Sequence, residues 1–490
     1  MLARTLLFAL MSLLTVYADA QNVLARLDLG RKDPKPSFFE YSPLDGGLVT
    51  FGPTSTRSSR YLGLVKYDAD LNEEWKVQVL EQNGRRNIDF LTVIGEHILI
   101  FLSEFSPAEG VIKTFYYSYN LDGMPLVEEG ILSVVPNQKE QKVDLQYVLS
   151  PNKQRLLAYK NLANRREAEN ILFFLFDEEG EVVENGEIDL RYPDNRFAVS
   201  NLRVSNQGNI YVLGKYARNT LSTNSTDFEH IVYRYDIMTR EAYEIKVNIG
   251  ERFITDLAFR LDRAENIYIA GFYSNRGTDM IAGTLLQIIS SSGELLQQSL
   301  DAFSEGFLSN YLSSGQINRG RELRNFYLDP QDGIILRSDG GVLLIAEKFY
   351  VTYQSYRDVY GGWIDRALYH YEDVIFTSVA SDGSIEWHAI VDKNQVSESP
   401  ANLSFFSAIG PMGSYIFYEY KPQRRPINVY VNNVGISGQV TEREPLLPDF
   451  RYGDAFFPKS SVQINSEEAL LVYLSNKGRT LSVVKVKIAG

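Results

Sequence analysis

The stretch NIYVLGKY occupies residues 209–216, and a near copy, NIYIAGFY, occupies residues 266–273. Both octets are apolar almost throughout, which is typical of a β-strand that is covered on both faces. Each carries a glycine at the same place, Gly214 or Gly271. A glycine inside a strand indicates that a backbone or a bulky side chain approaches closely there. The repetition therefore predicts that the chain builds one kind of twice-buried strand more than once.

Strands of the same kind recur along the chain, and most of them follow a turn with Gly, Asn or Asp. Downstream of each comes a further strand and then a second turn, such as Asp122-Gly123 or Asp382-Gly383. The other copies are GLVTFG (47–52), ILIFL (98–102), RLLAYK (155–160), VLLIAEKFY (342–350), YIFYEY (415–420) and ALLVYL (469–474). Each unit then reads as four antiparallel strands in about 45–60 residues, the pattern of a β-propeller blade.

The last unit lacks one strand, because it ends on TLSVVKVKI at residues 480–488. The segment NVLARLDL, residues 22–29, is a candidate for the missing strand. Pairing these two segments would close the ring and remove the open sheet edges. We therefore predict an all-β fold, a propeller of eight four-stranded blades closed by the N-terminal strand, with seven blades as the alternative. Long helices and βαβ units are missing from the pattern, which argues against a Rossmann or barrel fold.

The first twenty residues, MLARTLLFALMSLLTVYADA, have the features of a secretory signal peptide. Arg4 supplies the positive charge, residues 6–14 are apolar, and Ala18-Asp19-Ala20 forms a cleavage site. We expect a mature chain that begins at Gln21 and forms one propeller domain over residues 21–490. No later stretch approaches the length of a membrane span. The expected location is therefore the periplasm or the outside of the cell, in soluble form.

Composition excludes several classes of function. The chain has no cysteine, so disulfides, thiolate metal sites and a cysteine nucleophile are excluded. Its formal net charge of −13 argues against nonspecific binding of nucleic acid, which requires neutralisation of phosphates.

Metal and cofactor motifs are weak. None of the four histidines, His97, His230, His370 and His388, has a partner at metal-ligand spacing, although a site assembled from distant blades stays open. Residues 68–72, DADLN, resemble the start of a calcium loop, but Glu73 stands where that loop requires glycine. The chain also lacks the Gly-Lys-x-x-Trp turns of quinone-dependent propeller dehydrogenases. We predict no cofactor and no metal.

The tetrapeptide Ser150-Pro-Asn-Lys153 matches the SxxK pattern of serine acyl-enzymes. That chemistry requires the serine and the lysine on one helical turn. Here the tetrapeptide is predicted to lie in a turn between two strands, so we assign it no catalytic role.

Two insertions in the sixth unit are the best functional signal. Residues 300–329 precede the unit, with helical spacing of apolar residues over 302–312, and a long loop rich in Tyr and Arg is predicted over 350–371. Antiparallel strand order places both insertions on one rim of the ring, where we expect them to touch. Aromatic and arginine side chains on such loops suit glycan, peptide or protein contacts, although they could merely pack the insertion onto the ring. The candidate ligand-binding residues are Tyr353, Tyr356, Arg357, Tyr360, Trp363 and Arg366.

The sixth unit also carries a family resemblance. Its segments SDGGVLLIAEKFY (338–350) and DVIFTSVASDGSIEWHAIVDKNQ (373–395) flank the Tyr-rich loop. This unit resembles a group of secreted β-propeller-like proteins of Bacteroidota. The resemblance implies an exported, ring-shaped protein, and it supplies no catalytic residues.

Two functions follow as hypotheses. The first is a noncatalytic binding or scaffold propeller of the cell envelope, with a protein or glycan partner on the inserted face. The alternative is an envelope hydrolase or lyase that acts on glycans through carboxylates in the central channel.

Overall fold

The structure is a computed structural model. It describes residues 23–54, 61–81, 86–136, 145–162, 168–193, 196–217, 228–277, 280–329, 333–357, 362–421, 427–447, 450–475 and 477–488. The predicted signal peptide and the candidate residue Tyr360 lie outside these ranges.

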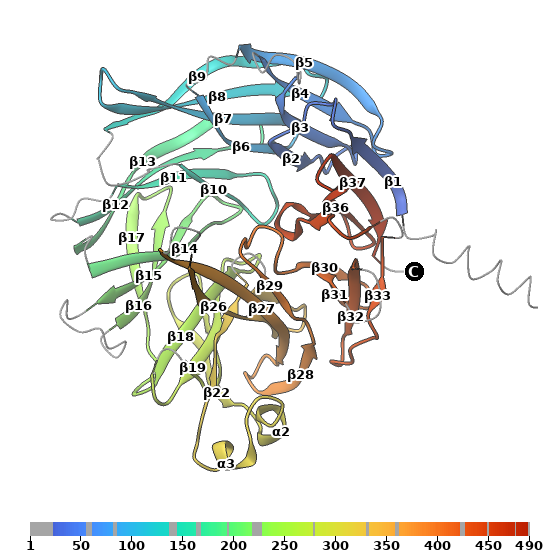
Figure 1. Cartoon of the computed structure of the whole chain (residues 1–490). Helices are drawn as coiled ribbons and strands as arrows, with labels where there is room; N and C mark the ends of the chain where they lie inside the picture. Colours follow the sequence, from blue (N-terminus) through green and yellow to red (C-terminus); the bar gives the residue numbers. More distant parts are fainter. Residues whose placement is uncertain are drawn as a thin grey trace, which may run out of the picture.

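The described residues form eight sheets of four or more strands, arranged as the ring of a β-propeller (Figure 1). The first strands β2 and β6 lie nearer the centre of the ring than the fourth strands β5 and β9. We number the sheets one to eight in chain order. Sheet one consists of β2 (Phe38–Tyr41), β3 (Leu48–Pro53), β4 (Tyr61–Tyr67) and β5 (Glu73–Glu81), and sheet two consists of β6 (Arg86–Ile94), β7 (His97–Ser106), β8 (Val111–Asn120) and β9 (Pro125–Pro136). Sheet three consists of β10 (Gln146–Leu149), β11 (Leu156–Leu162), β12 (Ala168–Phe176) and β13 (Val182–Pro193), and sheet four consists of β14 (Phe197–Val204), β15 (Ile210–Ala217), β16 (Phe228–Asp236) and β17 (Glu241–Val247).

Sheets five to eight keep the same antiparallel order, and sheets six and eight have interrupted first strands. Sheet five consists of β18 (Phe253–Leu261), β19 (Ile267–Ser274), β21 (Gly283–Ile289) and β22 (Leu295–Ala302), and sheet six consists of β24 (Phe326–Leu328), β25 (Ile334–Leu336), β26 (Val342–Arg357), β27 (Trp363–Val379), β28 (Ile385–Val391) and β29 (Gln395–Ser397). Sheet seven consists of β30 (Phe406–Gly410), β31 (Gly413–Tyr420), β32 (Asn428–Gly435) and β33 (Glu444–Pro445), and sheet eight consists of β34 (Ala455–Phe456), β35 (Val462–Gln463), β36 (Glu468–Ser475), β37 (Thr480–Lys487) and β1 (Val23–Leu29). The 3-10 helix η3 (Pro458–Ser460) lies between β34 and β35.

The N-terminal strand completes sheet eight. β1 pairs antiparallel with β37, from Val23↔Val486 to Leu29↔Leu481 with one bulge. The predicted pairing of the two chain ends is therefore confirmed. A hydrogen bond of 2.6 Å from the Ser482 hydroxyl to Asp28 holds the register. The strand covers an edge that β37 would otherwise expose.

The repeated octet is buried on both faces because each strand packs between two neighbouring sheets. In β15, Ile210 and Val212 join a core cluster with sheet three, whereas Tyr211 and Leu213 join a cluster with sheet five. Successive residues of a strand point to opposite faces, so residues at odd and at even positions must both be apolar when both faces are covered. This packing explains why the octet does not alternate.

The two octet glycines are required by close approach, as predicted. A side-chain carbon at Gly214 would collide with the ring of Phe197, and one at Gly271 would collide with the backbone oxygen of Asp256.

The first insertion is less helical than predicted. Within 302–312, only α2 (Glu305–Leu308) is an α-helix; α3 (Ser314–Ile317) follows, and β23 (Leu323–Arg324) pairs with β20 (Met280–Ile281). The Ser304 hydroxyl caps α2 by accepting from the Phe307 amide at 3.2 Å. Phe303 and Phe307 are buried in the core cluster between sheets five and six. The apolar spacing thus reflects anchoring of a short helix rather than a long one.

Candidate functional site on the sixth sheet

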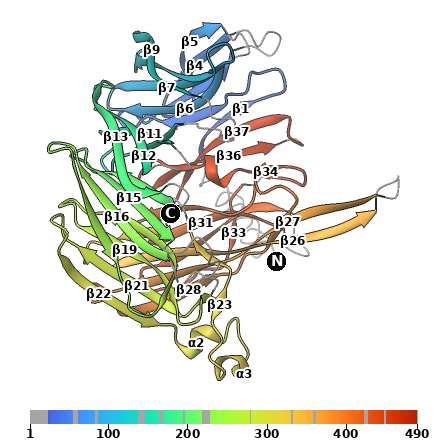
Figure 2. The ribbon, with the colours of Figure 1, turned by 90° about the vertical axis from the view of Figure 1, so that its left-hand side faces the viewer.

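The segment 350–371 was predicted as a loop, but it is largely a β-ribbon, so that prediction is wrong. β26 and β27 pair from Val342↔Val379 outward to Arg357↔Trp363, with one bulge near Lys348. We call residues 349–357 and 363–371 the ribbon; it projects beyond the rest of the ring (Figure 2). Strand-forming residues such as Val351, Thr352 and Tyr353 continue without a turn signal, so pairing persists past the edge of the sheet.

The register separates the candidate residues onto the two faces of the ribbon. Arg357 lies directly opposite Trp363, and its guanidinium carbon is 5.1 Å from the centre of the indole ring. On the other face, the guanidinium carbon of Arg366 lies 4.4 Å from the ring centre of Tyr356. Residues directly opposite in an antiparallel pair share a face, and neighbouring pairs alternate. Arg357 and Trp363 therefore lie on one face of the ribbon, and Arg366 lies on the other.

The ribbon exposes large aromatic surfaces. Tyr353 is 72% exposed and Trp363 is 67% exposed. Arginine stacking orders the Trp363 ring without covering it, at an energy of about 0.5–1 kcal/mol for an exposed cation–π pair. On the same face as Trp363, the Ser355 hydroxyl donates to the Asp365 carboxylate.

Ion pairs and stacked rings brace the foot of the ribbon. Glu372 accepts hydrogen bonds of 2.6 Å from both Lys348 and the Tyr350 hydroxyl. Burial opposes the ionisation of Glu372, but these two donors outweigh it and hold the pKa of the carboxyl below its usual value. The ring of Tyr350 stacks on His370 with centres 4.4 Å apart. The ribbon therefore stands on a fixed base.

One side of the ribbon is an open strand edge. β24 pairs with β26 only as far as Lys348, and the Phe349 amide donates to Asn325 at 2.8 Å. Beyond Phe349, no strand within the described ranges pairs with the outer edge of β26. On the β27 side, β29 pairs with Tyr369–Tyr371, and Glu398 just beyond it binds Arg366 at 2.7 Å.

The first insertion meets the sixth sheet at the foot of the ribbon. Phe326 is paired with Lys348, and the ring of Tyr327 lies 6.4 Å from that of Phe349. Phe307 stacks on His388 of β28, with ring centres 4.1 Å apart. These contacts are with Lys348, Phe349 and His388, which lie outside residues 350–371, so they do not show the predicted contact between the two insertions. Tyr353 and Trp363 lie farther out along the ribbon.

Two carboxyl groups with raised pKa values lie on first strands of the sheets. Burial raises the pKa of Glu40 on β2 to about 7, against a smaller lowering by Lys153. Burial also raises the pKa of Asp256 on β18 to about 6, although its carboxylate accepts a 2.7 Å hydrogen bond from the Leu328 amide. Neither shift is caused by another carboxyl group, which is the usual cause in a catalytic carboxyl pair.

The weaker motifs have structural partners. In the turn between β10 and β11, where it was predicted, Ser150 donates to the Asn152 side chain at 2.7 Å. Asp68 accepts from the amides of Asp70 and Asn72 at 2.9 and 2.8 Å, as in an ordinary Asx turn. Over the described ranges, no group of three or more His, Asp or Glu residues is placed to hold a metal ion. No helix in those ranges is long and apolar enough to cross a membrane.

A groove between sheets four and five escaped the sequence analysis. Its lining comes from β16, β17, β21, β22 and the turn after β21, and includes Arg234, Tyr243 and Gln298. Residues from different sheets meet there, so no local motif marks it. The available signal was Tyr243, which stands where two other units carry a tryptophan.

Comparisons with known proteins concern the fold. No protein-family model and no curated protein matches the chain by sequence. The polysaccharide lyase Uly1 is similar in structure, with 10% identity, a TM-score of 0.37 and coverage of 96% of this chain and 100% of that one. The β-propeller domain of the Trilobed protease from Pyrococcus furiosus has 12% identity and a TM-score of 0.35, over 85% of this chain and 96% of that one. A prolyl endopeptidase has 9% identity and a TM-score of 0.42, over 91% of this chain and 55% of its own length. The chain is a β-propeller protein, and likeness at this level says nothing about activity.

Proposed function

We propose that this protein is a noncatalytic binding propeller whose ribbon contacts a partner protein. The observation that carries the proposal is the exposure of Tyr353 and Trp363 on a braced ribbon that projects from the ring. Aromatic side chains flanked by arginine are enriched at the centres of protein interfaces. A scaffold that fixes such residues in advance lowers the entropic cost of binding.

The strand edge favours a protein partner over a glycan. The outer edge of β26 beyond Phe349 offers backbone donors and acceptors to an extended segment. A partner strand can add to such an edge through main-chain hydrogen bonds, while side chains at alternate positions supply specificity. A glycan would use the aromatic faces but would leave this edge unused.

We further propose that the protein acts in the cell envelope after export. The support is the predicted signal peptide, together with the resemblance of the sixth unit to secreted propeller-like proteins of Bacteroidota. N-terminal sequencing of the native protein should give Gln21 as the first residue. Recovery of Met1 from a cytoplasmic fraction would contradict export.

Capture of partners from an envelope fraction tests the binding role. The double variant Tyr353→Ala/Trp363→Ala should retain less than about one tenth of the captured partner, with little change in melting temperature, because both side chains are exposed. Tyr452→Ala is the matched control, since Tyr452 is 76% exposed with Lys421 over its ring and lies outside the ribbon. Equal capture by the double variant and the wild type would reject the proposal. Capture that survives protease treatment of the fraction but not glycosidase treatment would assign the surface to a glycan instead.

The alternative, a glycan hydrolase or lyase using channel carboxylates, ranks second. Its support is the raised pKa of Glu40 and of Asp256, since a carboxyl that stays neutral near pH 6–7 can act as a general acid. Glycosidases generally need two carboxyl groups that flank one bond. Loss of a measured glycan-cleaving activity in both Glu40→Gln and Asp256→Asn would favour the enzyme.

A further inference from the structure

At three junctions between neighbouring sheets, a side chain on the outer strand reaches the turn of the following sheet. Trp75 on β5 lies against Gly123 in the turn of the following sheet, where an added side-chain carbon would lie 3.1 Å from the indole. The Trp75 indole N–H donates to the backbone oxygen of Leu121 in that turn at 2.9 Å. Trp387 occupies the same register position on β28 and lies against Gly438 of the next sheet.

A smaller side chain makes the same connection between sheets five and six. Gln297 holds the equivalent position on β22, opposite Ile288. Its side-chain amide donates to the backbone oxygen of Asp382 in the following turn at 2.8 Å. The position is therefore used repeatedly to reach across the junction between sheets.

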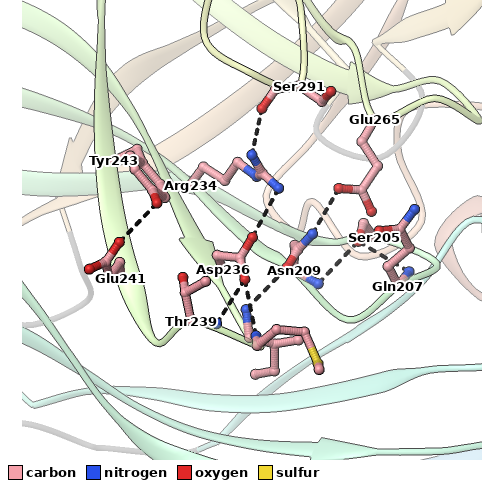
Figure 3. A network of polar contacts seen from close by, with 12 residues as sticks. Ser205, Gln207, Asn209, Arg234, Asp236, Thr239, Glu241, Tyr243, Glu265 and Ser291 are labelled. Carbon is pink, nitrogen blue, oxygen red and sulfur yellow. Dashed lines mark hydrogen bonds and ion pairs between the residues drawn. The ribbon is translucent and has the colours of Figure 1, made fainter.

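The junction between sheets four and five departs from this pattern. Tyr243 holds the equivalent position on β17, opposite Arg234. Its hydroxyl donates to Glu241 on its own strand at 3.0 Å, and the side chain is 46% exposed (Figure 3). Tyr243 therefore makes its hydrogen bond on its own sheet and not to the following turn.

Arg234 donates a hydrogen bond to the following turn, as the Trp75 indole does between sheets one and two, but it does not fill the space of an indole ring. Arg234 donates to the backbone oxygen of Ser291 at 2.5 Å, and Asp236 holds the guanidinium at 3.2 Å (Figure 3). Ser291 stands two residues before Gly293, as Leu121 stands two residues before Gly123. At Gly293, however, the nearest neighbour of an added side-chain carbon is Ile245 at 3.9 Å. Gly293 is therefore not covered by an aromatic ring, whereas Gly123 and Gly438 are each covered by a tryptophan.

The result is an open groove of about 660 Å³. Ile245, Ile289 and Leu295 give it apolar walls. The Gln287 amide donates to the oxygens of Asn248 and Gln298, both at 3.0 Å, so oriented amide groups lie at its polar side. Binding pockets commonly have volumes of about 300–1,000 Å³ and combine apolar walls with a few polar groups.

We propose that this groove binds an aromatic side chain, tryptophan foremost, presented by a peptide or a protein loop. The fold packs an indole on the corresponding turn glycine at two other junctions, so the geometry of the groove suits the same ring. Arg234 adds a cation beside the ring. The remaining volume and the amides admit the backbone on either side of the aromatic residue. This site is separate from the ribbon and does not depend on its function.

The test uses N-acetyl-5-fluorotryptophanamide and the protein of residues 21–490, with ligand-observed fluorine NMR. Saturable broadening of the probe signal is expected, with N-acetylalaninamide failing to compete. Tyr243→Trp should weaken binding at least about tenfold without lowering the melting temperature, because it fills the groove with the residue used elsewhere. Tyr327→Trp, which adds a tryptophan at an exposed tyrosine outside the groove, should leave binding unchanged.

A second pair of variants guards against misfolding. Leu295 lines the groove and is 53% exposed, so Leu295→Arg should weaken binding while preserving the core. Trp75→Tyr should reproduce the open junction between sheets one and two and add a second probe site. Absence of saturable binding by the wild type would overturn the proposal, as would binding that neither Tyr243→Trp nor Leu295→Arg alters. Competition by methyl glycosides but not by tryptophan dipeptides would reassign the groove to carbohydrate.

Discussion

Lys393 and Glu347 form an ion pair beneath the ribbon, with 2.5 Å between Nζ and the carboxylate, and the lysine side chain is fully buried. Ser404 donates to the other oxygen of Glu347 at 2.6 Å, and the lysine also donates to Gln395 at 3.0 Å. Burial lowers the pKa of Lys393, although Glu347 opposes that shift. The amide of Gln395 donates to the backbone of Glu419 on sheet seven at 2.9 Å, so the network ties the foot of the ribbon to the next sheet.

Breaking this pair should be costly. Lys393→Met should lower the free energy of unfolding by about 3–5 kcal/mol, because it leaves the Glu347 carboxylate buried without its cation. Lys348→Met is the matched control; it removes a partly exposed pair with Glu372 and should cost about 1 kcal/mol or less. Urea unfolding measures both. Equal losses would contradict the prediction, and Lys393→Met/Glu347→Leu should recover much of the loss.

Removal of the closing strand should destabilise the ring. Deletion of residues 23–29 exposes the edge of β37 and uncovers apolar side chains, for a loss on the order of several kcal/mol and a tendency to self-associate. Thermal unfolding and size-exclusion chromatography measure the two effects. Leu24→Asp is the control within the strand, because Leu24 is exposed. If the deletion left both the melting temperature and the elution volume unchanged, β1 would not close the ring.

Glu40 should make stability fall with rising pH. Its pKa is raised to about 7 by burial, so the folded state holds a proton that the unfolded chain releases above its ordinary value of 4.5. Stability contributed by the neutral form is complete below about pH 4.5 and is lost progressively up to about pH 7. Glu40→Gln keeps a neutral side chain at every pH, so the variant should gain about 1–3 kcal/mol relative to wild type between pH 5 and 7.5. A difference that does not change with pH would contradict the assignment.

The first insertion should behave as part of the core. Phe307 is buried between Phe303 and His388, with ring centres 4.9 and 4.1 Å away. Phe307→Ala should therefore cost about 3–5 kcal/mol in denaturant unfolding. Tyr327→Ala, at an exposed position in the same insertion, should cost much less. If both variants lost a similar, small amount of unfolding free energy, the insertion would not contribute to the stability of the ring.

Local sequence patterns predicted most of the fold. The twice-buried octets, the turn glycines and the pairing of residues 22–29 with the C-terminal strand all follow from residue periodicity and turn chemistry, which act over a few neighbouring residues. The same reasoning chose the sixth unit as the candidate site and selected Tyr353 and Trp363, since aromatic side chains on an insertion are visible in composition. The sequence reasoning placed these residues on a loop, because no sequence pattern distinguishes a strand pair that extends beyond its sheet from a loop.

By itself, the sequence determined the kind of strand, the order of strands in each unit and the residues available for binding. Only the tertiary structure decided which of those residues share a face, because the register between β26 and β27 separates Trp363 from Arg366. The groove beside Tyr243 likewise depends on the space between two sheets, which is set by side chains distant along the chain. Distances across strands and between sheets arise from packing of the whole ring, and no stretch of sequence encodes them locally.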